Sequence, residues 1–512
     1  MPQNQLYFGD NLWHLKQMED HCVDLIYLDP PFNSDAHYNV IFDRPDGESS
    51  EAQAGAFRDT WTWTEESEKA YDAVMSRGGA PAQMLSGMMS ILGKSNTLAY
   101  ICMMTPRLIE MRRVLKTTGS IYLHCDATAN AYIRIMLNAV FGAAQFRNEI
   151  IWYYYNKMHD SRKKLFPRAT DTIFFYVNDL DSNFTFHQLK EKRDKPFKQL
   201  ARKKVGGKMI NARDDAGKLI YRIKEDRTLD NVWRIPCLQP ASPERIGYPT
   251  QKPLALLQRI IEASSDEGYT VLDPFCGCGT AIEAAQSLNR NWIGIDVTHY
   301  AIEVIEGRLR REFDGMKVPV NGRPEDMEGA RALAQRDKHQ FQFWANWLVG
   351  VQNYREIKKG ADQGIDGIIF FKNGPFGTGR VIVSVKGGET VNPAMVRDLA
   401  GTVDGENAQL GIFVCLANPT PAMKDAAART GIVKTAHGVF PKVQIMTIRE
   451  LMEGKRPNLP PYYRVEEDGR PDKKRIQAED PQLSFKFVFK GRGKSAQVEE
   501  AIYPSAELLL SR

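Results

Sequence analysis

Residues 271–280, VLDPFCGCGT, indicate the fold of most of this chain. A short apolar run typical of a buried strand leads into a glycine-rich turn, and AIEAAQSLNR (281–290) then has helical spacing. WIGID (292–296) follows as the next strand. Strand, turn, helix and strand in this order predict a parallel, doubly wound α/β sheet.

The turn itself has the properties of a ligand site. Gly277 and Gly279 allow the backbone to approach a ligand closely, and the helix that begins after them favours a carboxylate or phosphate at its N-terminus. Asp296 ends the next strand, where its carboxylate can accept hydrogen bonds from both ribose hydroxyls. The pattern is FxGxG, not the GxGxxG of dinucleotide sites. A tight turn without a ligand is the alternative.

A second corner follows the apolar run 24–29, DLIYLD. Asp29, Pro30, Pro31 and Phe32 would present a carboxylate, an unpaired carbonyl and an aromatic face on a stiff, extended backbone. These groups suit a planar base with an exocyclic amine, because two acceptors can take the amine hydrogens while Phe32 stacks on the ring. The alternative is a proline-bounded strand end with a surface aspartate.

Together the two motifs resemble those of the amino-methyltransferases that use S-adenosylmethionine to methylate exocyclic amines in DNA. The amine motif precedes the cofactor motif, which is similar to the beta-class order. GDNLWHL (9–15), GSIYLHCD (119–126), NEIIWYY (148–154) and YPTQKP (248–253) also look like this family. The resemblance covers about residues 5–312 and implies a Rossmann-like methyltransferase domain that acts on double-stranded DNA.

The resemblance also implies roles for individual residues. The cofactor pocket would be formed by Asp273, Phe275, Gly277, Gly279 and Thr280, with Asp296 on the ribose and Thr250 and Lys252 near the methionine end. The target amine would be held by Asp29, Pro30, Pro31 and Phe32. Aspartate in the first position usually accompanies adenine N6 and serine accompanies cytosine N4, so adenine is favoured and N4-cytosine methylation is the alternative.

Such a reaction needs positioning more than acid–base chemistry. Hydrogen bonds from the amine to Asp29 and a proline carbonyl would turn the nitrogen lone pair towards the methyl group for an in-line displacement. No covalent enzyme intermediate is required. The base would have to leave the duplex to reach this pocket.

A basic segment separates the two motifs. Residues 157–227 contain 19 Lys and Arg against 10 Asp and Glu, with Phe and Tyr between them. Its position predicts a target-recognition insert, about residues 156–246, in which cations neutralise phosphates and a few side chains read base edges. A solvated charged surface is the alternative.

A second α/β unit is expected near the C-terminus. ADQGIDG (361–367) and RVIVSVKGG (380–388) resemble a PD-(D/E)xK nuclease of the Mrr-like restriction endonuclease type, which implies Asp366 as a Mg²⁺ ligand and Lys386 as the catalytic lysine. The departure is Ser384, where an acidic residue or glutamine is usual, and Asp362 is a candidate helper. The domain would therefore cleave DNA, or be a degenerate nuclease that only binds, or be an unrelated α/β domain.

The expected organisation is a methyltransferase domain at 1–320, a nuclease-like domain at 340–450, and a linker with an appendage at 451–512. A helix at 98–116 is expected to end at Gly119, and a charged helical stretch is expected over 301–338. The chain's 512 residues carry a net charge of +5, which allows a nucleic-acid partner without requiring one.

The cellular setting follows from several absences in the sequence. The chain has seven cysteines without a CxxC pair, which argues against a disulfide framework or a zinc site. It has no apolar run of about 18 residues, so we expect no membrane contact and a cytoplasmic location. The expected setting is restriction–modification or phage defence. A homodimer, an RNA substrate, and a Mg²⁺-dependent nuclease with the methyltransferase half as sensor stay open alternatives.

Overall fold

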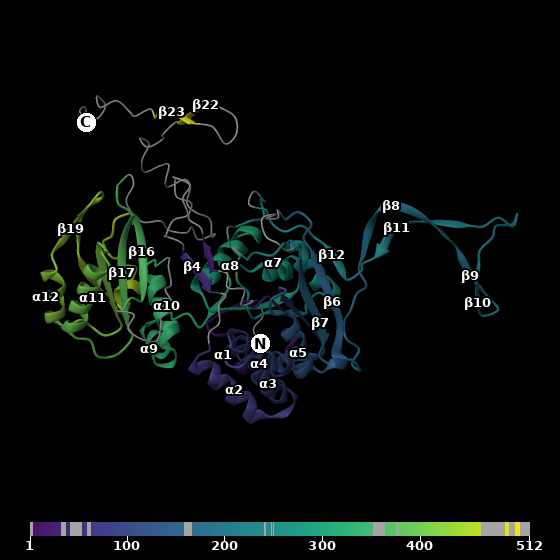
Figure 1. Cartoon of the computed structure of the whole chain (residues 1–512), viewed down its shortest axis with the longest axis horizontal. Coiled ribbons are helices and arrows are strands. Elements are labelled where there is room, and N and C mark those ends of the chain that lie inside the picture. The colour runs from purple at the N-terminus through teal and green to yellow at the C-terminus, as the bar shows by residue number, and fades with distance from the viewer. Residues whose placement is uncertain are drawn as a thin grey trace.

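The computed structural model describes residues 4–31, 37–40, 54–58, 63–157, 166–239, 242–246, 248, 250–351, 364–374, 378–461, 487–490 and 497–501. A nine-stranded sheet forms the centre of the N-terminal part of the chain (Figure 1). Its strands, in spatial order, are β12 (Val232–Arg234), β6 (Phe146–Tyr153), β7 (Thr170–Val177), β5 (Leu115–Cys125), β2 (Val23–Leu28), β13 (Thr270–Asp273), β14 (Asn291–Asp296), β1 (Gln5–Phe8) and β15 (Val320–Asn321). β7 is antiparallel to both neighbours, and the other pairs are parallel.

Helices cover both faces of this sheet, which is why its central strands consist almost wholly of buried residues. One face carries α1 (Asn11–Gln17), α2 (Glu65–Arg77), α3 (Gly79–Leu92), α4 (Asn96–Val114) and α5 (Asn130–Phe141), followed by the short η1 (Ala143–Gln145). The other face carries α6 (Leu254–Ser264), α7 (Thr280–Ser287) and α8 (His299–Glu312). The predicted doubly wound α/β fold is therefore confirmed.

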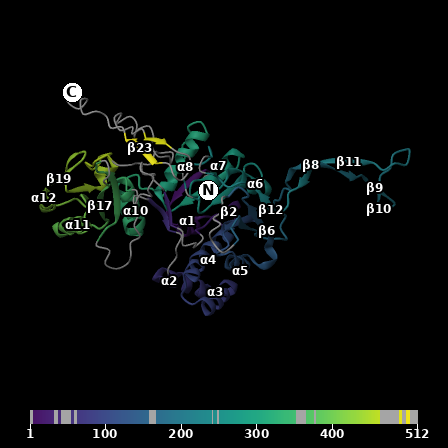
Figure 2. The same cartoon turned by 45° about the horizontal axis from the view of Figure 1, so that its top comes forward.

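The basic segment forms a β-arm, defined here as residues 190–228, that projects from the body of the molecule (Figures 1 and 2). β8 (Lys190–Leu200) pairs antiparallel with β11 (Tyr221–Thr228), and β9 (Arg202–Val205) pairs with β10 (Lys208–Asn211) towards the end of the arm. Large apolar side chains are exposed along it, including Ile223 at 65% exposure. The described residues of the arm form no apolar cluster of their own, and most side chains on its outer strands are exposed.

The C-terminal unit has a four-stranded sheet in the order β16 (Gly367–Lys372), β17 (Thr378–Lys386), β18 (Leu410–Cys415) and β21 (Val443–Thr447). β16 and β17 are antiparallel, and the remaining pairs are parallel. α11 (Pro393–Gly405) and α12 (Pro421–Arg429) pack on one face. α9 (Met327–Arg336), α10 (Lys338–Leu348) and α13 (Ile448–Met452) belong to the apolar cluster on the other. Besides the two strand pairs of the β-arm, three antiparallel pairs of the described residues lie outside the two main sheets: β19 (Ile432–Thr435) with β20 (Gly438–Pro441), β3 (His37–Val40) with β4 (Ala54–Arg58), and β22 (Phe487–Lys490) with β23 (Gln497–Ala501).

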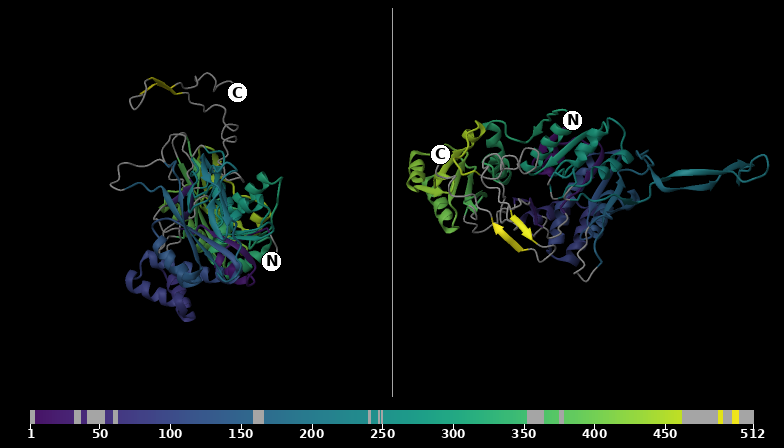
Figure 3. Two further views of the ribbon diagram at one scale, coloured as in Figure 1. Left: turned by 90° about the vertical axis from the view of Figure 1, so that its right-hand side faces the viewer. Right: turned by 90° about the horizontal axis from the view of Figure 1, so that it is seen from above.

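The two units lie side by side (Figure 3). They share one apolar cluster, which extends from the α6–α8 face of the large sheet into α9, α10 and the C-terminal sheet. At the junction, the ring of His299 stacks on Trp347 with 4.8 Å between ring centroids and lies 3.7 Å from the ring centroid of Phe8. His299 is fully buried at the start of α8. The C-terminal unit therefore packs directly against the N-terminal unit.

Two local expectations were wrong. Gly119 lies inside β5 and does not end a helix; α4 already ends at Val114. A Cβ at position 119 would lie 2.6 Å from Leu115 Cδ1 and 2.8 Å from the carbonyl oxygen of Asp24, so close approach of the chain is what requires glycine here. The charged stretch 301–338 is not one helix, because α8 ends at Glu312 and the chain forms β15 before α9 begins. The predicted domain boundaries stay a prediction.

Candidate active site

Three acidic residues meet where neighbouring parallel strands end. Asp29 follows the last residue of β2, Asp273 ends β13, and Asp296 ends β14. The registers Ile26 with Leu272 and Gly294 with Asp273 place these strand ends side by side. From β2 the sheet continues to β5 on one side, and from β13 it continues to β14 on the other. Ligands of open α/β sheets bind at such a reversal of strand order.

The glycine-rich turn lies directly above this edge. Gly277 and Gly279 both have positive φ, +49° and +76°. A Cβ on Gly279 would lie 2.7 Å from Ile305 Cγ1, and one on Gly277 would lie 3.5 Å from the ring of Tyr248. The amide of Gly277 donates to Asp296 Oδ2 at 2.9 Å. Glycine is therefore required at both positions, at 279 by packing and at both by the backbone conformation.

Asp296 is half-buried, and its carboxylate already accepts several hydrogen bonds. Its Oδ1 accepts from the Thr298 amide and hydroxyl, both at 2.9 Å, and its Oδ2 accepts from Gly277. Burial outweighs these bonds and raises the pKa of Asp296. Each carboxylate oxygen can accept two hydrogen bonds, so Oδ2 still has capacity for a ligand hydroxyl.

Asp273 is buried below the turn and accepts from the amide of Phe275 at 3.1 Å. Burial, and then the negative charges of Asp29 and Asp296, raise the pKa of Asp273 well above its usual value. This carboxyl group therefore favours its neutral form. Its contacts are those of a residue that shapes the turn, consistent with the role that the sequence suggested.

Asp29 forms an ion pair with Lys252, which lies just before α6 and 223 positions away in sequence. The two side chains are only 15% and 13% exposed. Lys252 bonds Oδ2 of Asp29, whereas the buried Oδ1 has no hydrogen-bond partner among the described residues. Pro30 is buried beside it, Pro31 is half-buried, and Phe32 lies outside the described residues. A buried acceptor oxygen without a partner is costly unless a ligand completes it.

Sequence reasoning placed Lys252 beside the cofactor and did not connect it with Asp29. Thr250 lies two residues before it, in the half-buried loop that leads to α6. The hydroxyl of Thr280, the first residue of α7, accepts from Arg308 Nη1 at 3.1 Å. Arg308 is buried and also forms an ion pair with Glu283. Thr280 is thus engaged inside the protein, at the start of the helix that follows the glycine turn.

A further group of residues at this edge was missed by residue-level reasoning, although its motif was noticed. Gly9 donates through its amide to the carbonyl of Asp296 at 2.9 Å, and the Asn11 side chain donates to the carbonyl of Pro274 at 2.7 Å. Arg107 from α4 holds Asn11 Oδ1 at 2.7 Å. The signal was GDN at positions 9–11, whose meaning depends on contacts 263 positions away.

Polar side chains from β2, β5 and β7, with Tyr154 just after β6, form a connected and largely buried chain beside Asp29. The Tyr27 hydroxyl lies 3.2 Å from His124 Nδ1, and His124 Nε2 lies 3.5 Å from Asp171 Oδ2. The hydroxyl of Tyr154 donates to Asp171 Oδ1 at 3.3 Å. Burial opposes ionisation of Asp171, but the His124 contacts and the charge of Lys252 prevail and lower the pKa of this carboxyl. The site therefore rests on a connected polar layer.

The predicted nuclease residues also meet, but as a closed arrangement. Asp366 Oδ2 accepts from the Val385 amide at 2.6 Å and the Ser384 hydroxyl at 3.2 Å, and lies 3.9 Å from Lys386 Nζ. Oδ1 accepts from the side-chain amide of Gln342, which comes from α10. No cluster of three metal-ligating side chains occurs among the described residues, and Asp362 lies outside them. Asp366 is therefore the one predicted metal ligand among the described residues, and Mg²⁺ is usually held by one or two carboxylates together with waters and substrate phosphates.

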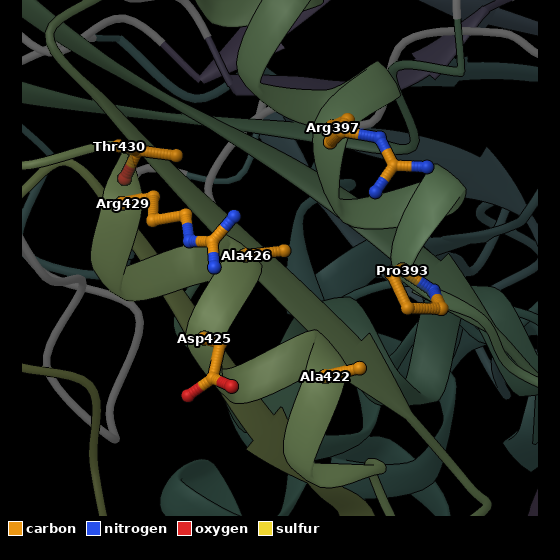
Figure 4. A pocket seen from close by; sticks show the side chains of 7 residues that line it. All are labelled: Pro393, Arg397, Ala422, Asp425, Ala426, Arg429 and Thr430. Atoms are coloured by element: carbon orange, nitrogen blue, oxygen red, sulfur yellow. The ribbon is translucent and has the colours of Figure 1, made fainter.

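A shallow hollow elsewhere on the C-terminal unit contains none of the predicted site residues. Figure 4 shows it between α11 and α12, and it is lined by Pro393, Arg397, Ala422, Asp425, Ala426, Arg429 and Thr430. Arg397 and Arg429 are exposed. Its chemistry is that of an ordinary charged surface.

A Rossmann-like sheet with a glycine-rich turn, an acidic strand end and an Asp-Pro-Pro corner at one edge is the arrangement of S-adenosylmethionine-dependent methyltransferases. The chain belongs to the DNA methylase family, whose model matches residues 23–307. A restriction endonuclease model matches residues 333–440. The predicted combination of a DNA amino-methyltransferase with an Mrr-like domain is therefore confirmed.

Individual proteins are similar to a little more than half of this chain. Type II methyltransferase M.HpaI from Haemophilus parainfluenzae is 28% identical over 301 residues, 59% of this chain and 72% of that protein. DNA adenine methyltransferase YhdJ from Escherichia coli (strain K12) is 26% identical over 305 residues, 59% of this chain and 80% of that protein. The solved M1.HpyAVI–SAM complex has 18% identity and a TM-score of 0.34, covering 60% of this chain and 98% of that one. Among the described residues, no helix is long and apolar enough to span a membrane.

Proposed function

We propose that this DNA methyltransferase transfers a methyl group from S-adenosylmethionine to the exocyclic N6 amine of adenine in double-stranded DNA. The observation that carries the proposal is Oδ1 of Asp29. This buried carboxylate oxygen has no partner among the described residues and lies at the strand edge that also holds the glycine turn. An amine hydrogen is the kind of donor that would complete it.

The described residues fit the cofactor. Gly277 and Gly279 provide a turn without side chains, and Oδ2 of Asp296 retains acceptor capacity for a ribose hydroxyl. Thr250 and Lys252 lie at the other side of the same edge, near Asp29. When bound, S-adenosylmethionine supplies an electrophilic methyl group on a sulfonium centre. The low exposure of Asp29 and Lys252 supports exclusion of water from the place where that methyl group would react.

The residues of the chain then act on the base. Asp29 Oδ1 would accept one amine hydrogen and the Pro30 carbonyl would accept the other, turning the nitrogen lone pair out of the ring plane. The lone pair would take the methyl group that the cofactor supplies, the electrons of the C–S bond would stay on sulfur, and the surplus N–H proton would be released to water. Phe32 would stack on the extruded base. Positioning and electrostatics supply the rate enhancement, as no covalent intermediate is needed.

Adenine is preferred over cytosine because the first residue of the corner is aspartate. The relative YhdJ is named a DNA adenine methyltransferase, which supports the same choice. N4-cytosine methylation would use the same acceptors and the same displacement. It is therefore the alternative that the experiment must distinguish.

The β-arm supports contact with duplex DNA. Its exposed Lys203 and Lys204 on β9, and Arg222 and Lys224 on β11, are available to phosphates. A two-stranded ribbon also has the width to enter the major groove. We assign target recognition to this arm and to the remainder of the predicted insert, residues 156–246. A homodimer is the assembly to be checked, by light scattering with and without DNA.

The decisive experiment incubates the full chain with unmethylated plasmid DNA and S-adenosylmethionine and then analyses the nucleosides by mass spectrometry. Detection of N6-methyladenine would support the proposal. Detection of N4-methylcytosine would change the target base to cytosine and leave the proposed mechanism unchanged. Absence of both products would contradict the proposed function. An RNA of equal length, added in a parallel reaction, tests the substrate class.

The C-terminal unit fits a restriction–modification or defence role through its family, but its described residues supply one carboxylate for a metal. The test of this unit is Mg²⁺-dependent cleavage of plasmid DNA by the wild-type chain. Cleavage that Asp366→Ala and Lys386→Ala both abolish would establish the nuclease alternative, with the methyltransferase half as sensor. The same gel, run on methylated and unmethylated plasmid, would reveal that sensing.

A further inference from the structure

The loop that carries Lys252 is held by hydrogen bonds that do not involve Asp29. The Gln251 side chain accepts from the Ile246 amide at 2.9 Å and donates to the Glu244 carbonyl at 2.8 Å. The Glu244 carboxylate in turn accepts from the Leu254 amide at 2.7 Å, at the first turn of α6. These bonds tie both ends of the loop together, so the position of Lys252 is set by the loop and not by Asp29 alone.

Asp29 lies among other acidic and ionisable groups. Its charge acts on Tyr27 of β2, Cys125 of β5 and Asp273 of β13. Asp171 of β7 acts on Tyr27 and Cys125, and Asp296 of β14 acts on Asp273. His124 on β5 lies between Tyr27 and Asp171. Lys252 is the cation that contacts Asp29 directly.

This crowding raises the pKa values of ionisable groups beside Asp29. Burial raises the pKa of Asp273, and the charges of Asp29 and Asp296 add to the rise while Lys252 opposes it. Burial likewise raises the pKa of Tyr27, with Asp29, Asp273 and Asp171 adding to it. Negative charge at this edge is therefore expensive, and a carboxylate without a cation would take up a proton.

The consequence for catalysis depends on which oxygen remains available. Lys252 occupies Oδ2 of Asp29 and leaves Oδ1 as the buried acceptor. If Asp29 took up a proton, it would gain a donor and no longer offer two acceptor oxygens. It would then meet the amine donor with a donor of its own.

We propose that Lys252 is a positioning residue for methyl transfer: it keeps Asp29 ionised and turned so that Oδ1 faces the target amine. This inference rests on the proposed function. It differs from the role that the family resemblance suggests for Lys252, which is to border the methionine end of the cofactor.

The test compares Lys252→Met and Lys252→Arg with the wild type, and uses Lys69→Met as a matched control. Lys69 is an exposed lysine on α2 that pairs with Glu65 at 2.8 Å, so its loss removes a lysine and an ion pair far from the site chemistry. The measurements are kcat/KM for methyl transfer between pH 5 and 9 and the Kd of S-adenosylmethionine by calorimetry. Infrared difference spectra of the cofactor-free protein, referenced to Asp29→Asn, report protonation of Asp29.

Lys252→Met should move the acid limb of the pH profile upward by at least about one pH unit, which is a tenfold loss on that limb. Activity should recover towards the wild-type value at high pH, and the cofactor Kd should change less than threefold. The carboxylic-acid band of Asp29 should appear at a higher pH than in the wild type. Lys252→Arg should keep the wild-type limb, and Lys69→Met should match the wild type throughout.

Two results would overturn the inference. A tenfold weaker cofactor Kd with an unmoved acid limb would assign Lys252 to the cofactor, and a Lys252→Met variant indistinguishable from the wild type would remove its role. Failure of the proposed function looks different, because the wild-type chain itself would then yield no methylated base.

Discussion

Replacing Asp29 with asparagine changes one atom and should invert the hydrogen-bonding character of the site. The ammonium group of Lys252 lies against Oδ2, so it will draw the amide oxygen of the new side chain to that side. The amide NH₂ group then occupies the place of Oδ1 and faces the amine of the base, donor against donor. The substitution therefore removes the acceptor and introduces a repulsive contact, while the volume of the side chain stays the same.

The expected loss follows from the burial of the pair. Removing one preorganised electrostatic contact in a water-excluded site typically lowers kcat by about 10²–10³-fold, or roughly 2.7–4 kcal/mol of transition-state stabilisation. The fold should also weaken, because Lys252 loses its carboxylate at 13% exposure. Breaking a fully buried pair costs about 3–5 kcal/mol, so about 1–3 kcal/mol of unfolding free energy is expected for this partly exposed one.

The assay is single-turnover methyl transfer to plasmid DNA, with cofactor Kd and urea unfolding measured on the same preparations. Asp29→Asn should bind S-adenosylmethionine within threefold of the wild type. The double variant Asp29→Asn with Lys252→Met is the informative control, since without the ammonium the amide can turn its oxygen towards the base. We expect it to be about tenfold faster than Asp29→Asn alone, a difference of roughly 1.4 kcal/mol in activation free energy.

The reasoning is refuted if Asp29→Asn retains kcat within threefold of the wild type, because a hydrogen bond to Oδ1 would then make no contribution to the rate of methyl transfer. If the double variant is slower than Asp29→Asn by the full effect of Lys252→Met, the two residues act independently. The orientation argument would then fail even though Asp29 remains necessary.

Other predictions concern the turn, the arm and the buried carboxyl group. Gly279→Ala should lower the unfolding free energy by about 2–4 kcal/mol, because its φ is +76° and the new Cβ would lie 2.7 Å from Ile305 Cγ1. Gly268→Ala is the matched control, with φ +78° and no atom within 4 Å of the new Cβ, and its unfolding free energy in urea should fall by only about 1–2 kcal/mol. Replacing both Lys203 and Lys204 by alanine should reduce the slope of log K against log salt for duplex DNA by about 1 per lysine, and an unchanged slope would remove β9 from the interface. Asp273→Asn in cofactor-free protein should be at least as stable as the wild type at pH 7, because a carboxyl group whose pKa is raised by folding stabilises the fold only at low pH and loses that effect as the pH rises. In thermal melts, the difference in stability should vanish below about pH 4. A variant clearly less stable than the wild type at pH 7 would contradict the pKa argument.

Much of the site could be predicted because each of its parts is local. The strand 24–29 with its prolines and the unit 271–296 with its glycines have meanings that depend on adjacent residues, namely burial, a stiff corner and a turn with positive φ. Gly119 shows where local reasoning fails. Its neighbours in sequence suggest a helix end, whereas the contact that requires glycine is with the backbone of Asp24 on the neighbouring strand.

The sequence by itself determined the fold class, the order of the two motifs and the residue types available at each. Only the tertiary structure decided which of those residues meet. The pairing of Lys252 with Asp29 and the contact of Asn11 with the backbone of Pro274 join positions 223 and 263 apart. The contacts of Asp366 with Gln342, Ser384 and Val385 likewise depend on the packing of α10 against β17. Local patterns report backbone preference and burial, but a side chain's electrostatic partner depends on strand order and helix packing.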